Sequence, residues 1–204
     1  MKPAVTFFKV LRWIVLVFLI GVILIALKRP TPPAPALDPA EIKTQAKNFE
    51  TKLNALEHEV QVRGTMEPAH FSSDEVNAFV QDAASRGLAG GSPIPATPAG
   101  QEAGTEIKST QVAFIGDEVV AQAVTQRYGK DVYVTVRGHL SAQNGYLKFT
   151  STGFKIGDLT VPVSLMDGPL KQKLSEPENR EKMKLPDFVR DLRIEKGELV
   201  MVPK

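Results

Sequence analysis

The sequence predicts an α+β fold in which an N-terminal transmembrane helix precedes one domain, an antiparallel β-meander packed on one or two amphipathic helices. Three observations lead to this prediction. An uncharged apolar block comes first, two segments with apolar residues at helical spacing follow, and the rest of the chain alternates between apolar and polar residues with repeated turn signals. A chain of 204 residues is long enough for one such domain with its own core, and it contains no internal repeat.

The expected transmembrane helix covers residues 10–27, after a short tail of residues 1–9. From Trp13 to Leu27 there is no charge, and twelve of these fifteen residues are Ile, Val, Leu or Phe. On an insertion scale they favour the bilayer by about 4–7 kcal/mol, which exceeds the roughly 3.5 kcal/mol that Arg12 costs at its worst depth. The helix would be about 27 Å long, close to the hydrocarbon thickness.

A cleaved signal peptide is the alternative interpretation of this block. Ala34-Pro35-Ala36 fits the small-residue cleavage pattern, but it lies well past the apolar run and among prolines, so we favour an uncleaved anchor. Cations flank the block on both sides, and we expect the amino terminus inside. The protein would then be single-pass, with its C-terminal domain outside the cytoplasm in a bacterial envelope.

Residues 28–37 form a Pro-rich spacer in this interpretation. In an extended polyproline conformation these ten residues reach about 30 Å. The domain of residues 38–204 holds 20 basic and 23 acidic residues, a net charge of −3, so the overall +2 comes from the first 37 residues. This balance argues against a nucleic-acid partner, and the absence of cysteine excludes a disulfide framework.

The first helix of the domain has a clear start signal in Leu37-Asp38-Pro39, followed by Glu41. Its apolar residues then recur at spacings of three and four: Ile42, Ala46, Phe49, Leu53 and Leu56. Such a stripe packs on the core of a domain or forms a coiled-coil dimer. Two heptads are fewer than a coiled coil requires, so we favour core packing.

The second helix is expected in "SSDEVNAFVQDAASRG", where Ser72 and Glu75 form a capping box and Gly87 ends the helix. Val76, Phe79 and Val80 share one of its faces. The Pro/Gly-rich stretch of residues 87–104 then predicts a loop within the domain. It lacks the GK[ST] motif and any Lys or Arg, so we reject a phosphate cradle.

After this stretch, apolar and polar residues alternate with a period of two, most clearly in "DVYVTVRGHL". Asn144-Gly145 is the strongest hairpin signal, and Gly116-Asp117, Gly157-Asp158 and Lys196-Gly197 are weaker ones. The expected strands cover residues 58–65, 106–115, 118–128, 131–141, 146–156, 158–163, 189–195 and 198–203. A turn at residues 165–170, leading into a short helix through Leu174, interrupts them.

The sequence contains few signs of catalytic or metal-binding residues. His58, His70 and His139 are far apart and lack the usual metal spacings, so we expect no metal and no cofactor. There is no G-x-S-x-G motif, and the acidic pair Asp117-Glu118 lies at an expected turn. We therefore expect a protein that is not an enzyme.

A resemblance to a known family comes from three segments, "SSDEVNAFV", "KIGDLTVPVSLMDGPL" and "LPDFVRDLRIEKGELVMV". In their order after an anchor and a spacer, they resemble membrane-anchored bacterial envelope proteins of the YpmS-like and LmeA-like kind. These proteins look like small relatives of the tubular, BPI-like lipid-binding fold. The resemblance implies a curved sheet that wraps a long helix around an apolar groove, and it carries over no catalytic residue.

The function predicted from these observations is the binding of a lipid or acyl chain in an apolar groove, next to the membrane that the anchor contacts. Burial of each methylene contributes about 0.8 kcal/mol and needs no exact polar chemistry. The candidate lining residues, each of which is otherwise ordinary core, are Phe79, Val80, Phe114, Phe149, Phe154, Leu165, Met166 and Leu170. The alternative is a scaffold or assembly factor that binds another envelope protein and no lipid.

Overall fold

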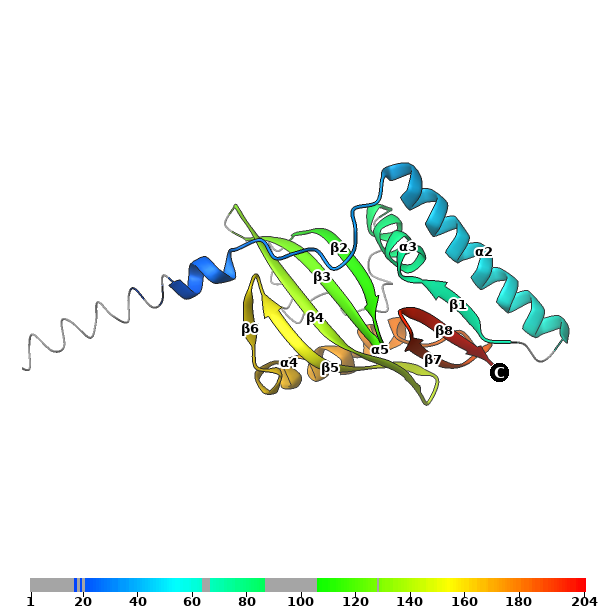
Figure 1. Cartoon of the computed structure of the whole chain (residues 1–204). Coiled ribbons are helices and arrows are strands. Elements are labelled where there is room, and N and C mark those ends of the chain that lie inside the picture. Colours follow the sequence, from blue (N-terminus) through cyan, green and yellow to red (C-terminus); the bar gives the residue numbers. More distant parts are fainter. Residues whose placement is uncertain (1–16, 18, 20, 64–66, 87–105, 128) are drawn as a thin grey trace, which may run out of the picture.

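The computed structural model describes residues 17, 19, 21–63, 67–86, 106–127 and 129–204, and it shows an α+β fold with two antiparallel sheets (Figure 1). The loop expected at residues 87–104 lies outside the described residues. The helices are α2 (Pro39–Arg63), α3 (Ser73–Ser85), α4 (Val163–Ser175) and α5 (Pro177–Lys182). The strands are β1 (Ala69–Ser72), β2 (Glu106–Ile115), β3 (Glu118–Arg127), β4 (Lys130–Gln143), β5 (Tyr146–Ile156), β6 (Leu159–Val161), β7 (Val189–Glu195) and β8 (Glu198–Pro203).

The prediction that the fold begins with a transmembrane helix is contradicted. Within the residues that the structure describes, no helix is long and apolar enough to cross a membrane. Where the structure describes this span, residues 17, 19 and 21–26 are helical. Residues 10–16, 18 and 20 of the expected span lie outside the described residues, as does the tail of residues 1–9.

The larger sheet is the expected antiparallel meander, with strand order β2-β3-β4-β5-β6. The predicted hairpin turns are confirmed, because Gly116, Gly145 and Gly157 all have the positive φ that these tight turns require. Residues that lie opposite one another on neighbouring strands point to the same face of the sheet, and successive residues along one strand point to opposite faces. The face of this sheet that carries Val112, Ala121 and Val136 is buried in the core, and we call it the inner face.

The smaller sheet has the order β1-β8-β7 and was predicted only in part. The closing hairpin of β7 and β8 is confirmed, but the strand expected at residues 58–65 is wrong, since α2 continues as a helix to Arg63. The first strand is instead the four-residue β1, in which Ala69 pairs with Met201. This pairing joins segments about 130 residues apart, so no local pattern in so short a strand could indicate it.

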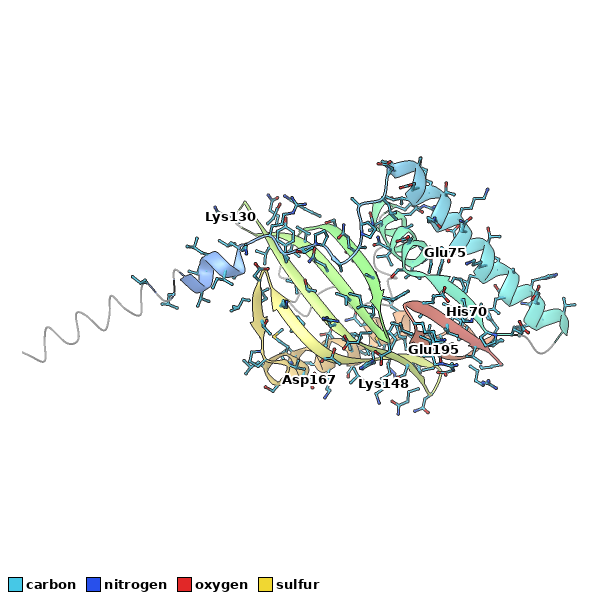
Figure 2. The ribbon with its side chains drawn as sticks, in the orientation of Figure 1. His70, Glu75, Lys130, Lys148, Asp167 and Glu195 are labelled. Atoms are coloured by element: carbon cyan, nitrogen blue, oxygen red, sulfur yellow. The ribbon has the colours of Figure 1, made fainter. Side chains whose placement is uncertain are left out.

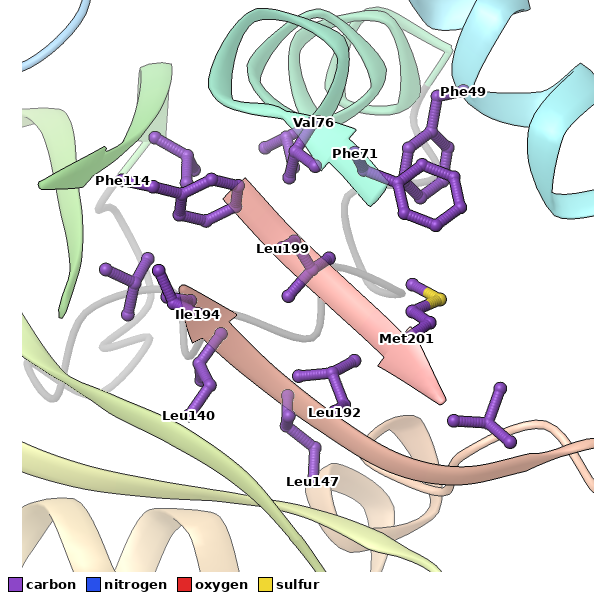
Figure 3. Close-up of a cluster of buried hydrophobic side chains, with 14 of the residues drawn as sticks. Phe49, Phe71, Val76, Phe114, Leu140, Leu147, Leu192, Ile194, Leu199 and Met201 are labelled. Carbon is purple, nitrogen blue, oxygen red and sulfur yellow. The ribbon is translucent and has the colours of Figure 1, made fainter. Parts of the chain in front are cut away.

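The main core lies between α2, α3 and the smaller sheet on one side and the inner face of the larger sheet on the other (Figure 3). Phe71 of β1 is fully buried, and its ring centroid lies 4.9 Å from that of Phe49 on α2. Phe49, Ala46 and Leu56 of the predicted stripe are all less than a tenth exposed. Core packing, the favoured interpretation of the first helix, is therefore confirmed.

The motif "SSDEVNAFV" builds the start of α3 and joins it to the larger sheet. Ser72 and Glu75 form the predicted capping box, and Lys52 of α2 pairs with the buried Glu75 carboxylate at 2.8 Å. One helical turn apart, Ser73 and Asn77 accept hydrogen bonds from the backbone N–H groups of Phe114 and Val112. These donors point out from the edge strand β2, so α3 satisfies an edge that would otherwise be unpaired.

Candidate functional site

The Pro-rich segment of residues 28–37, which we call the strap, lies across the face of the larger sheet opposite the core. Figure 1 shows it crossing in front of β4, β3 and β2 before it reaches α2. Ala34 in the strap is only 4% exposed. The segment predicted to be a spacer is thus packed against the domain, and we call the sheet face beneath it the outer face.

The start of the strap is held by the turn between β5 and β6, in a set of contacts that we call the clasp. The backbone N–H of Asp158 donates to the carbonyl of Ile25 at 3.2 Å, and Lys28 Nζ lies 2.9 Å from the Asp158 carboxylate. The hydrogen bond and charge of Asp158 raise the pKa of Lys28 above its ordinary value. Gly157 packs so closely that an added Cβ would lie 2.3 Å from the carbonyl oxygen of Ala26.

Between the strap and the outer face lies a cavity of about 560 Å³. Its roof includes Pro30, Thr31 and Pro33 of the strap, and its floor comes from β2 to β6. Because prolines have no backbone N–H, the strap cannot pair with the sheet as a regular strand. In the described part of the chain no hydrogen bond links residues 29–37 to the sheet, so the roof is held by packing and at its ends.

The floor of the cavity changes character from one edge of the sheet to the other. On the β2–β3 side the apolar side chains of Ile115 and Val120 contribute to it, together with Glu118, which lies opposite Ile115 across the strands. On the β5–β6 side it is polar, and three side chains from neighbouring strands form one row there, Thr135, Lys155 and Thr160. The cavity therefore has an apolar end and a hydrogen-bonding, charged end.

Glu118 and Arg137 occupy the middle of the floor as an ion pair. Arg137 Nη2 donates to Glu118 Oε2 at 2.9 Å, and the Thr152 hydroxyl donates to the other carboxylate oxygen. The aliphatic part of Arg137 lies over Gly153, where an added Cβ would make ordinary contacts at 3.6 Å and beyond. Both oxygens of Glu118 are thus engaged, and Gly153 leaves the space above it open.

The eight predicted lining residues lie mainly on the inner side of the sheet. Phe149, Phe154 and Met166 meet in a small cluster at the α4 end, and Phe149 also contacts the main core. The remaining members are separated: Phe79, Val80 and Phe114 belong to the main core, Leu170 is buried at 3% exposure, and Leu165 is 66% exposed. Of the eight, Phe154 alone also lines the cavity.

The residues that do line the cavity were not singled out from the sequence. Thr135 and Arg137 belong to the polar alternate positions of "DVYVTVRGHL", which ordinarily face solvent. The strap prolines resemble a free spacer, because nothing in a local pattern shows which surface a polyproline segment touches. The one available signal was the Gly157-Asp158 turn, whose place in the clasp depends on a contact with residues far away in sequence.

His70 and His139 each lie beside one acidic residue and are not part of the cavity lining. His70 lies 3.0 Å from Glu198, and His139 lies 3.7 Å from Asp117, on separate parts of the surface. No group of three or more histidine, cysteine or acidic residues close enough to hold a metal ion occurs in the described part of the chain.

Comparison of the chain with protein-family models, with curated proteins and with solved structures gives no match in any of the three. The resemblance to YpmS-like and LmeA-like envelope proteins therefore stays a prediction from the sequence.

Proposed function

We propose that this domain is a non-enzymatic binding module that holds an acyl chain in the cavity beneath the strap. The observation that carries the proposal is a cavity of about 560 Å³ roofed by a proline-rich segment with few polar contacts. Ligand sites commonly have volumes of about 300–1,000 Å³, so this cavity has the size of a small-molecule site. The proposal moves the predicted ligand from the inner to the outer face of the sheet.

The distribution of residues in the cavity supports an elongated ligand with one apolar end. The floor spans five strands, which is about 19 Å from β2 to β6 at the usual strand spacing. A hydrocarbon tail at Ile115, Val120 and Pro33 would gain about 0.8 kcal/mol for each buried methylene. The threonines and Lys155 at the opposite end suit a polar head.

The acidic residues at the cavity are engaged by the protein's own side chains. Both oxygens of Glu118 accept hydrogen bonds, and Asp158 pairs with Lys28 in the clasp. These acids organise the cavity walls in this proposal and take no part in proton transfer.

The test compares two substitutions of Gly153 in the full-length protein. Uptake of a fluorescent fatty acid would be measured by titration, and retained ligand by native mass spectrometry. Gly153→Val places a branched side chain in the cavity at a strand position that tolerates it, while Gly153→Ala adds one methyl group at ordinary contact distance. We expect wild type and Gly153→Ala to bind and Gly153→Val to bind at least about tenfold more weakly, a loss of about 1.4 kcal/mol.

Two results would overturn the proposal. Absence of both retained ligand and uptake in the wild-type protein would leave the scaffold interpretation as the better account. Equal uptake by wild type and Gly153→Val would show that an acyl chain binds elsewhere on the molecule.

A further inference from the structure

We propose that the ligand of this cavity is a single-chain amphiphile whose head is a carboxylate, bound by the row of Thr135, Lys155 and Thr160. This inference rests on the proposed function, because it names the chemical class of ligand for the same cavity. It depends on three properties of the cavity: the balance of charge, the cross-strand geometry of the row, and the position of the apolar end.

The charges around the cavity leave one cation without a partner. Glu118 is paired with Arg137 at 2.9 Å, and Asp158 is paired with Lys28 at the same distance. Lys155 forms no hydrogen bond or ion pair with any residue that the structure describes. Since Glu118 and Asp158 already have partners, Lys155 is the charged residue of the described lining that a ligand carboxylate could pair with.

The geometry of the row places two hydroxyl groups beside this cation. Lys155 is opposite Thr135 on β4 and opposite Thr160 on β6, so the three side chains share the outer face as direct cross-strand neighbours. Direct cross-strand neighbours have Cβ atoms about 4.5–5.5 Å apart, so one threonine flanks the lysine on each side, and the two threonines lie about 10 Å from each other across two strand spacings. A carboxylate held by the Lys155 ammonium group can accept a further hydrogen bond from a flanking hydroxyl.

The hydroxyl of Thr135 is oriented as a donor by its neighbour. Gln122 Nε2 donates to Thr135 Oγ1 at 3.1 Å, which occupies one lone pair of that oxygen. The O–H of Thr135 is then available to donate to a ligand. A neutral acceptor could use this donor too, but the ammonium group of Lys155 favours an anion.

The apolar end of the cavity determines how the ligand would lie. Ile115 and Val120 are at the β2–β3 side, and the row of donors is at the β5–β6 side. A carboxylate held by Lys155 therefore directs its hydrocarbon chain across the strands and beneath the strap. Such a molecule has the structure of a fatty acid.

The test uses decanoate and decanol, which share one hydrocarbon chain and differ in the charge of the head. Binding of each to the full-length protein would be measured by isothermal titration at neutral pH, where the carboxylate is ionised. Lys155→Gln removes the unpaired charge. Lys148→Gln is the matched control, because Lys148 lies on β5, is not part of the cavity lining and projects away from the strap (Figure 2).

We expect Lys155→Gln to weaken decanoate binding about tenfold, as the loss of one charged hydrogen bond of about 1.4 kcal/mol predicts, and to leave decanol binding unchanged. Lys148→Gln should change neither. Added salt should weaken decanoate binding to the wild type more than to Lys155→Gln, since screening acts on the charge that the variant lacks.

The outcomes separate this inference from the proposed function. If decanoate and decanol both bind but Lys155→Gln affects neither, the carboxylate head is refuted while the acyl-chain site stands. If neither compound binds the wild-type protein, both proposals fail. A loss of decanoate binding in Lys148→Gln equal to that in Lys155→Gln would also refute the row as the binding site.

Discussion

Substitution of Gly157 by alanine should release the strap from the sheet. Gly157 lies in the turn between β5 and β6 with φ at +57°, and an added Cβ would lie 2.3 Å from the oxygen and 2.7 Å from the carbon of the Ala26 carbonyl. Both atoms belong to the backbone, so no side-chain rotation can relieve the overlap. The segment of residues 25–28 must move away from the turn.

The loss of stability expected for Gly157→Ala follows from a comparison with a second turn. Gly145 has φ at +77° and nothing within 4 Å of an added Cβ, so Gly145→Ala carries only the left-handed backbone cost of about 1–2 kcal/mol. Gly157→Ala carries a similar backbone cost and also breaks the hydrogen bond from Asp158 N–H to the Ile25 carbonyl. That bond contributes about 0.5–1.5 kcal/mol, which is the excess destabilisation we expect in Gly157→Ala.

Limited proteolysis measures the release directly. Trypsin cleaves after Lys28, and it should not cleave after Arg29 because Pro30 follows. Mass spectrometry of the product that begins at Arg29 therefore reports access to the clasp. We expect this product to form several times faster from Gly157→Ala than from Gly145→Ala or wild type, and fluorescent fatty acid to exchange faster as well.

Equal unfolding free energies and equal rates of cleavage after Lys28 in Gly157→Ala and Gly145→Ala would contradict the expected role of Gly157. The strap would then lie on the outer face without being held by the clasp. Faster cleavage in both variants would indicate that backbone strain at any turn loosens the domain, and the special role of Gly157 would be lost.

Two further predictions concern the rest of the domain. Asn77→Ala should lower the unfolding free energy by about 1–3 kcal/mol, because the buried N–H of Val112 loses its acceptor. Thermal unfolding measures this loss of stability, and an unchanged unfolding midpoint would contradict the prediction. A hydrogen bond from Ser151 lowers the pKa of Asp167 below 3.8, so its carboxylate stabilises the folded protein above that pH and loses the effect as the pH falls through the lowered value. The stability difference between wild type and Asp167→Asn should therefore be larger at pH 7 than at pH 3 in urea unfolding, and an equal difference would contradict this assignment.

Elements with a strong local pattern could be predicted from the sequence. The hairpin at Asn144-Gly145 is one example, because two residues with positive φ are needed there and the flanking residues alternate. The capping box of Ser72 and Glu75 is another, since both partners lie within one helical turn. In each case the interaction that forms the element joins residues only a few positions apart.

Elements that depend on distant partners could not be predicted in this way. Strand β1 is four residues long and exists because β8 pairs with it. The same limit applies to the candidate site, because the cavity forms only where the strap meets the outer face at Gly157 and Asp158. The transmembrane helix was predicted from composition alone, and no described helix fulfils that prediction.

By itself, the sequence determined the α+β class, the order of the meander strands and the stripe of α2 that packs on the core. Each of these follows from residue periodicity, which acts over a few neighbouring positions. Only the tertiary structure decided that residues 28–37 lie on the outer face and cover part of a cavity there. The reason is physical: proline-rich chain makes few hydrogen bonds of its own, so its position is set by the surface on which it packs.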